Sequence, residues 1–154
     1  ADLREFIAKN LWKEEKRAAF QAIRYDQELD ITGMDIDPKA VSAAKHNAEE
    51  AGVEDCIRFE RADAAKLHVE GQNGILITNP PYGERIGEEK EIRKIYGGLG
   101  KFLKANPDWS LFLVTTDKEA EEKILQRKAD RRRKLYNGRL EVCYYQFHGQ
   151  KPGK

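Results

Sequence analysis

The sequence predicts an α/β fold, in which an open, doubly wound and mostly parallel sheet ends in an antiparallel hairpin. Short apolar runs typical of buried strands alternate along the chain with segments of helical periodicity, and this alternation favours parallel strands covered by helices. Near the carboxyl end, Asn137-Gly138 separates two runs of strand-forming residues, Arg133 to Tyr136 and Arg139 to Phe147. This dipeptide is a strong hairpin signal, and parallel sheets often carry such an antiparallel edge.

The expected elements follow one another in a regular order. A helix covers Leu3 to Ile23, and a strand covers Ile31 to Ile36. Asp37 is a suitable N-cap for the next helix, Pro38 a suitable first residue, and Gly52 a suitable end. Three further strands are expected, at Ile57 to Arg61, Ile75 to Thr78 and Leu111 to Thr115. Two further helices are expected, at Ile92 to Leu103 and Ala120 to Leu125.

Length and composition predict one globular domain with a highly charged surface. The chain has 154 residues, of which 40% are hydrophobic and 36% charged, and its net charge is +1; this length is enough to bury a core. No apolar run has the length of a membrane span, and no signal peptide opens the sequence. Cys56 and Cys143 lack metal-ligand spacing. We therefore expect a cytoplasmic protein with free thiols, no metal site and no membrane partner.

Polar residues stand at the ends of three expected strands, where ligands bind in this architecture. Asp35 can accept the hydroxyl groups of a ribose; helix capping is the alternative, although Asp37 already fits that role. Asp63 follows the next strand and can meet an adenine amino group, or it can be a simple turn residue. The third strand ends in Asn79-Pro80-Pro81-Tyr82, which places a carboxamide and a phenol at the same edge of the sheet.

This tetrapeptide resembles the signature of class I S-adenosylmethionine methyltransferases that act on planar exocyclic or amide nitrogens. The stretches GMDIDPKAVSAAKHNAEEAG, TNPPYGERIG and KADRRRKLYNGRLEVCYYQF are similar to the catalytic domain of the THUMP-containing 23S rRNA guanine-N2 methyltransferases. The resemblance covers the sequence from Ile31 onward. NPPY alone is shared with DNA adenine and protein glutamine methyltransferases, whereas the GERIG extension and the KLYNG hairpin favour the ribosomal RNA branch.

The resemblance implies methyl transfer from S-adenosylmethionine to the exocyclic N2 of a guanine in large-subunit ribosomal RNA. The Asn79 side-chain oxygen and the Pro80 carbonyl would each accept one N–H of the target nitrogen, so that its lone pair faces the methyl group. Tyr82 would stack on a base that has left its helix. The expected cofactor contacts are Asp35, Ile36 and Asp63.

A basic cluster lies at the start of the expected hairpin. If it contacts RNA phosphates, the candidate residues are Arg131, Arg132, Arg133 and Lys134, with Arg85 as a further candidate beyond Tyr82. A solvated charged surface is the alternative.

Two elements of the family are not found in the sequence. No strand with a glycine-rich loop precedes Ile31, and Gly97-Gly98-Leu99-Gly100 lies inside a helical pattern, so we do not assign it to the cofactor. The upstream THUMP region is also not found. We therefore expect residues 1–154 to be a catalytic domain that lacks its first strand and loop, and an upstream segment of the same protein to complete it.

Three functions remain open. The favoured one is part of a ribosomal RNA guanine-N2 methyltransferase. The second is the same chemistry on protein glutamine or DNA adenine. The third is a non-catalytic RNA-binding or partner module.

Overall fold

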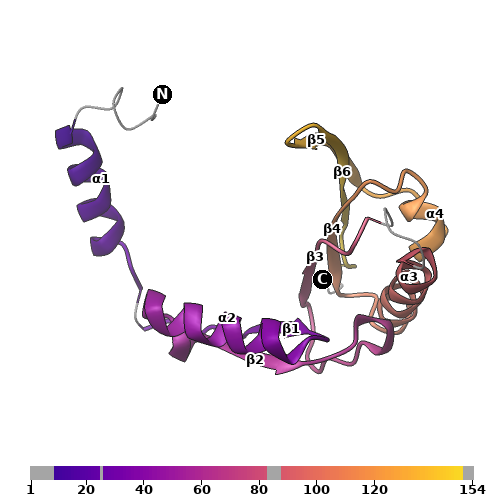
Figure 1. Cartoon of the computed structure of the whole chain (residues 1–154), viewed down its shortest axis with the longest axis horizontal. Coiled ribbons are helices and arrows are strands. Elements are labelled where there is room, and N and C mark those ends of the chain that lie inside the picture. Colours follow the sequence, from indigo (N-terminus) through magenta and orange to yellow (C-terminus); the bar gives the residue numbers. More distant parts are fainter. Residues whose placement is uncertain (1–8, 25, 83–87, 151–154) are drawn as a thin grey trace.

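The computed structural model describes residues 9–24, 26–82 and 88–150 (Figure 1). Its helices and strands are, in chain order, α1 (Lys9–Gln21), β1 (Ile31–Asp35), α2 (Pro38–Ala51), β2 (Ile57–Arg61), β3 (Ile75–Thr78), α3 (Glu88–Ala105), β4 (Ser110–Thr115), α4 (Ala120–Leu125), β5 (Arg131–Asn137) and β6 (Leu140–Phe147). Short 3-10 helices lie at η2 (Glu54–Cys56) and η3 (Ala64–Lys66). No described helix has the length and apolarity to cross a membrane.

The α/β class is confirmed, but the strands form two sheets. β1 pairs with β2 in parallel, and a second sheet has the order β3-β4-β6-β5. β3 and β4 are parallel, whereas β6 is antiparallel to both β4 and β5. Among the described residues, one edge of β1 and one edge of β3 therefore have no strand partner.

The caps of α2 form as the sequence predicts. The Asp37 side chain accepts a hydrogen bond from the backbone N–H of Lys39, and Pro38 is the first helical residue. Gly52 ends the helix with φ 67°, in the left-handed region that glycine tolerates best. The result is a helix of 14 residues that lies along β1 and β2 (Figure 1).

The core lies between the four-stranded sheet and the helices α3 and α4. Leu111 and Leu113 of β4 are fully buried on this face. The other buried members of the core are Ile92, Tyr96, Leu99, Phe102, Leu103, Trp109, Ala120, Ile124, Tyr145 and Phe147. On the opposite face of the sheet, Ile75 and Ile77 of β3 are 60% and 80% exposed. The described helices thus cover one face of this sheet and leave an apolar strip on the other.

The N-terminal part of the chain buries far less. Before β3, Ala48 is the only buried hydrophobic residue among those described. Helix α1 projects away from the sheets (Figure 1), and its large apolar side chains are exposed: Leu11, Trp12 and Phe20. The first residues of the expected helix, including Leu3, lie outside the described residues.

The C-terminal hairpin is confirmed, but its turn lies one residue later than the sequence indicates. Asn137 pairs with Leu140, so Gly138 and Arg139 form the two-residue loop. Gly138 has φ 63°. A loop with positive φ at its first position favours glycine there, and Asn137 therefore remains in the strand.

Candidate active site

A cavity of about 740 Å³ lies at the carboxyl ends of β1, β2 and β3. Five of the residues that the sequence predicts for the cofactor and the reaction line it: Asp35, Ile36, Asp63, Asn79 and Pro80. They come from three separate strand ends, two in the β1–β2 sheet and one at β3 in the other sheet, and all three ends face the same cavity. A cavity of this size is ample for a small-molecule ligand.

Asp35 is held in place from its own loop. Its Oδ1 accepts a hydrogen bond of 2.8 Å from the backbone N–H of Asp37, whereas the helix cap itself is Asp37. The backbone N–H of Ala62, after β2, donates to the Asp35 carbonyl at 3.0 Å. Asp35 therefore does not cap α2, and its exposed carboxylate lines the cavity.

Ile36 follows Asp35 with an exposed apolar side chain. The Arg61 side chain donates from Nε to the Ile36 carbonyl oxygen at 3.0 Å. This contact fixes the backbone of the β1 loop against the end of β2, so that Ile36 presents an apolar surface to the cavity.

Asp63 has the turn role that the sequence left open, and it also lines the cavity. Its Oδ1 caps η3 by accepting from the backbone N–H of Ala65 at 2.9 Å. Helix α3 packs closely on η3 at Gly98, where an added Cβ would lie 2.5 Å from the Ala64 carbonyl oxygen. Within the glycine cluster of α3, Gly98 therefore allows the close packing that holds η3 and Asp63 against the helix, and Gly100 allows a similar approach to Ile124.

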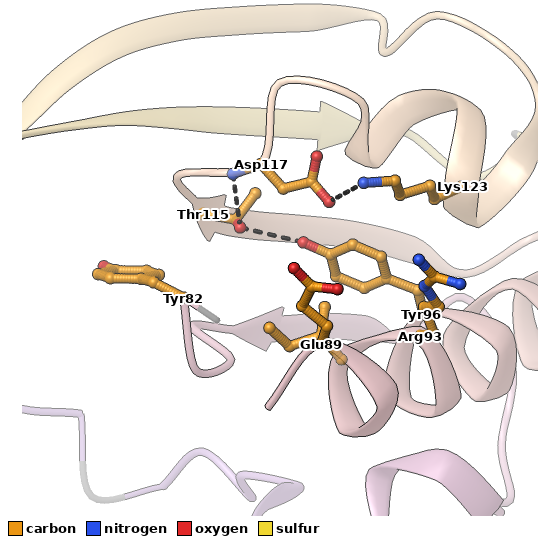
Figure 2. Close-up of a pocket in the computed structure, with 8 residues that line it drawn as sticks. Tyr82, Glu89, Arg93, Tyr96, Thr115, Asp117 and Lys123 are labelled. Atoms are coloured by element: carbon orange, nitrogen blue, oxygen red, sulfur yellow. Dashed lines mark hydrogen bonds and ion pairs between the residues drawn. The ribbon is translucent and has the colours of Figure 1, made fainter. Parts of the chain in front are cut away.

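The segment after β3 contacts two cavities, with Pro81 at the first and Tyr82 at the second. Asn79 is exposed and Pro80 is buried, and both line the first cavity. Tyr82 lines an adjoining cavity of about 240 Å³ together with residues of α3, α4 and the end of β4 (Figure 2). The Thr116 hydroxyl donates to the Tyr82 carbonyl oxygen at 3.4 Å, which ties the segment after β3 to the end of β4.

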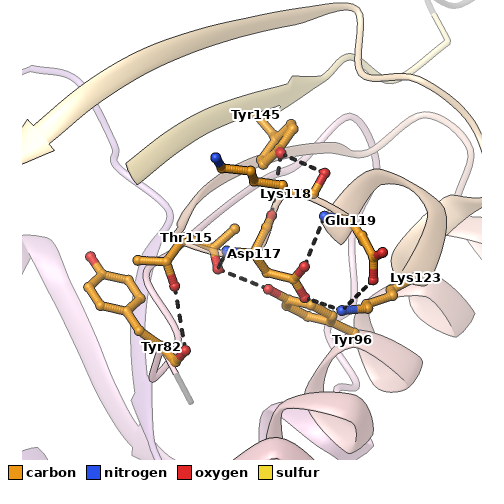
Figure 3. Close-up of polar contacts among 9 residues, drawn as sticks. Tyr82, Tyr96, Thr115, Asp117, Lys118, Glu119, Lys123 and Tyr145 are labelled. Atoms are coloured by element: carbon orange, nitrogen blue, oxygen red, sulfur yellow. Dashed lines mark hydrogen bonds and ion pairs between the residues drawn. The ribbon is translucent and has the colours of Figure 1, made fainter. Parts of the chain in front are cut away.

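A polar network that sequence reasoning missed forms the wall of the second cavity (Figure 3). The hydroxyls of Tyr96 and Thr115 share a buried hydrogen bond of 3.0 Å, and the Asp117 N–H donates to the Thr115 hydroxyl at 3.1 Å. Lys123 donates to the Asp117 carboxylate at 2.7 Å. The Thr-Thr-Asp sequence at the end of the β4 strand, read by the same strand-end rule, is the signal that could have found it.

Two groups of this wall have pKa values shifted further above neutral pH. Burial raises the pKa of the Tyr96 phenol, so the phenol stays neutral. The hydrogen bond to Asp117 raises the pKa of the Lys123 ammonium, so that group stays charged. The wall thus presents a neutral Tyr96 phenol and a charged Lys123 ammonium near neutral pH.

The basic cluster divides between the two faces of the β5–β6 hairpin. Successive residues of a strand point to opposite faces, so Arg132 and Lys134 lie on one face and Arg131 and Arg133 on the other. Arg132 is 3.7 Å from Glu121, and Lys134 forms an ion pair with Glu141. Arg132 and Lys134 also line a cavity that includes Thr116, which places their face on the Tyr82 side. Arg85 lies outside the described residues.

The sequence matches the model of one protein family over most of its length. The family is described as UPF0020, the RMKL-like methyltransferase domain, and the match covers residues 2–146. YpsC of Bacillus subtilis (strain 168), named as a candidate RNA methyltransferase, is 38% identical over 93% of this chain. The ribosomal RNA large subunit methyltransferase K/L of Shewanella baltica (strain OS185) is 42% identical over 79% of this chain. The chain spans 37% of the first relative and 17% of the second.

Solved structures agree with this match. The crystal structure of SMU.472, a candidate methyltransferase complexed with SAH, superposes with a TM-score of 0.82 at 38% identity, over 96% of this chain and 39% of that one. A protein from Listeria monocytogenes, described as a predicted N6-adenine-specific DNA methylase, has a TM-score of 0.79 at 36% identity, over 95% of this chain and 37% of that one. The chain therefore belongs to the UPF0020 family of RMKL-like methyltransferase domains.

Proposed function

We propose that the chain carries the acceptor site and part of the cofactor site of an S-adenosylmethionine-dependent enzyme that methylates the exocyclic N2 of a guanine in large-subunit ribosomal RNA. One observation carries this proposal. Asn79 and Pro80 line the same cavity as Asp35, Ile36 and Asp63, and Tyr82 lines the adjoining one. A cofactor in the first cavity and a base in the second would meet at Asn79 and Pro80.

The first cavity suits the nucleoside part of the cofactor. Carboxylates accept hydrogen bonds from hydroxyl and amino groups, which a ribose and an adenine supply. Asp35 and Asp63 each have one oxygen bound to a backbone N–H, and this contact orients the carboxylate as a whole. Ile36 adds an apolar surface for the adenine ring. When bound, the cofactor supplies an electrophilic methyl group on a sulfonium.

Residues of the β3 end would prepare the nitrogen for transfer. The lone pair of an exocyclic amine is delocalised into its base, so the amine is a weak nucleophile. Hydrogen bonds from its two N–H groups to the Asn79 Oδ1 and the Pro80 carbonyl favour tetrahedral geometry and free the lone pair. Pro80 is buried, its ring fixes φ, and Pro81 after it restricts ψ to extended values, so its carbonyl direction is restricted. Orientation of this kind can supply much of a rate enhancement.

The RNA would approach over the β5–β6 hairpin. Arg131, Arg132, Arg133 and Lys134 are exposed on β5, and the face of Arg132 and Lys134 is the one nearer Tyr82. Contacts with phosphates would hold the strand while the target base leaves its helix and stacks on Tyr82. The name of the Shewanella relative supports ribosomal RNA as the substrate.

We further propose that a strand from outside residues 1–154 lies between β1 and β3. Both strands have an unpaired edge among the described residues, and side chains from both line a cavity of about 300 Å³, including Thr32, Met34, Ile75 and Ile77. Unpaired edges and exposed isoleucines favour an added strand. The relatives are longer than this chain, and an upstream segment with a glycine-rich loop would complete the cofactor site.

The second candidate is the same chemistry on another acceptor. The description of the Listeria relative favours adenine in DNA, and a glutamine amide in a protein offers a similar planar nitrogen. A fragment that binds RNA without catalysis is the third candidate, and the open groove between β1 and β3 favours it.

An acceptor assay separates these candidates. The longest form of the protein that contains residues 1–154 is incubated with labelled S-adenosylmethionine and, in separate reactions, ribosomal RNA, duplex DNA and a protein extract. We expect label in RNA, as N2-methylguanosine after nuclease digestion and mass spectrometry. Label in N6-methyladenine or methylglutamine would support the second candidate, and RNA binding without transfer would support the third.

A further inference from the structure

The cavity beyond Tyr82 contains more polar groups than stacking on a base requires. It is lined by Tyr82, Glu89, Ile92, Arg93, Tyr96, Thr115, Asp117 and Lys123. Figure 2 shows the Glu89 carboxylate beside the hydroxyl end of the Tyr96 ring, on the side that faces Tyr82. A base stacked on Tyr82 would therefore place one of its edges near that carboxylate.

Most polar groups of the cavity already have partners within the protein. The Asp117 carboxylate accepts from the Glu119 N–H at 2.9 Å through one oxygen and from Lys123 at 2.7 Å through the other. The Tyr96 and Thr115 hydroxyls bind each other. These contacts make Asp117 and its neighbours a wall, and Glu89, in the first turn of α3, is the carboxylate that extends into the open space.

We propose that Glu89 determines the specificity for guanine by accepting the N1–H of the target base. This inference rests on the proposed function, because it assumes that the target nitrogen is held at Asn79 and Pro80. If both hydrogens of N2 are bound there, N1–H is the neighbouring donor on the same edge of guanine. Glu89 approaches that edge from α3, whereas Asn79 and Pro80 approach it from the end of β3.

The chemistry of the bases makes a carboxylate selective at this point. In guanine, ring nitrogen N1 beside the exocyclic amine carries a proton, and a carboxylate is an acceptor only. In adenine and cytosine, the corresponding ring nitrogens are unprotonated acceptors. A carboxylate would repel the lone pairs of these nitrogens, and it would itself have no hydrogen-bond donor to accept from. The two effects together disfavour the wrong base more strongly than a missing contact alone.

The test uses a base that keeps the amine and loses the donor. In 2-aminopurine the exocyclic N2 is present, but N1 is unprotonated. We compare the methylation rates of two RNA substrates, one with guanosine and one with 2-aminopurine riboside at the mapped target position, for the full-length protein and its Glu89→Gln variant. Glutamine has the same size and can donate to N1 of 2-aminopurine.

The measured quantity is the ratio of kcat/KM for guanosine to kcat/KM for 2-aminopurine. Intrinsic base reactivity is the same for both enzymes, so the change in this ratio reports the contact. We expect the ratio to fall at least about tenfold in Glu89→Gln, as for loss of one charge-assisted hydrogen bond. Glu50→Gln, which removes the same charge from an exposed site on α2, should leave the ratio unchanged.

The outcomes separate this inference from the proposed function. An unchanged ratio in Glu89→Gln, with normal guanine methylation by the unaltered protein, overturns the role of Glu89 and leaves the proposed function intact. A protein that methylates a nitrogen other than guanine N2 overturns both. An equal fall in Glu50→Gln would assign the effect to net charge and would also overturn the role of Glu89.

Discussion

The N-terminal region, residues 9–61, and the C-terminal region, residues 88–150, differ in how well they bury their apolar side chains. The described part of the N-terminal region buries one hydrophobic residue, Ala48, whereas the C-terminal region contains the whole core cluster around Leu111, Leu113 and Tyr145. The proposed cofactor contacts Asp35 and Ile36 lie in the weakly packed region. The two halves of the proposed site therefore lie on regions that are packed with unequal firmness.

The largest expected effect concerns the cofactor side. Residues 1–154 alone should bind S-adenosylmethionine very weakly and methylate nothing detectable, because the proposed added strand and loop would hold the methionine end. Each lost hydrogen bond to a charged group contributes about 1.5–3 kcal/mol, and every 1.4 kcal/mol is about tenfold in affinity. A micromolar site would weaken towards millimolar. Calorimetric titration of this chain with S-adenosylmethionine measures the affinity.

Addition of the upstream segment, on the same chain or as a separate one, should restore both binding and transfer. If residues 1–154 by themselves bound S-adenosylmethionine with micromolar affinity, the cofactor site would need no added segment. The proposed strand would then be wrong.

The next effect concerns the acceptor side. Asn79→Ala in the longest form of the protein should nearly abolish methyl transfer while RNA affinity changes little, because the variant loses an acceptor for the target amine and keeps the basic hairpin. Single-turnover methylation and RNA binding are measured on the same preparation. Asn47→Ala, an exposed change on α2, serves as the matched control. Near-normal transfer by Asn79→Ala would remove Asn79 from the reaction.

Stability measurements would test the contrast in packing directly. Leu113→Ala removes a fully buried side chain and should lower the free energy of unfolding by about 2–5 kcal/mol. Ile31→Ala, at a position that is 46% exposed, should lower it by about 1 kcal/mol or less. Urea denaturation of residues 1–154 measures both. Equal losses would mean that β1 is packed as firmly as β4.

The smallest effect concerns the basic hairpin. If both Arg132 and Lys134 contact phosphates, changing them to Gln should reduce the slope of log RNA affinity against log salt by roughly 0.7 per residue for single-stranded RNA. The pair Arg131→Gln and Arg133→Gln, on the other face of β5, should change the slope less. Salt titrations of RNA binding by the two double variants show which face of β5 contacts the phosphates. If neither pair changes the slope, the cluster is a solvated surface.

Local signals in the sequence predicted most elements and the composition of the first cavity. Asp37 and Gly52 act within one or two residues of the helix they cap, and strand ends meet at one edge in any parallel sheet, so Asp35, Asp63 and Asn79 could be placed together. The turn of the hairpin moved to Gly138 because strand pairing, rather than the Asn-Gly dipeptide, sets the register. The proposed roles of the site residues remain predictions.

The second cavity could not be predicted in the same way. Its wall joins Tyr96 from α3 to Thr115 and Asp117 from the end of β4 and to Lys123 from α4. No local pattern specifies which helix packs on which strand end, so this network depends on the tertiary packing of the core.

The close approach at Gly98 has an evolutionary consequence. Glycine inside a helix is about 0.5–1 kcal/mol less favourable than alanine, so mutation would be expected to replace it wherever space allows. At Gly98 even one methyl group would meet the carbonyl oxygens of Ala64 and Ala65. Such a change would push η3 away from α3 and carry Asp63 with it. In an alignment of relatives, glycine should therefore be conserved at position 98, although Gly98 lines neither cavity.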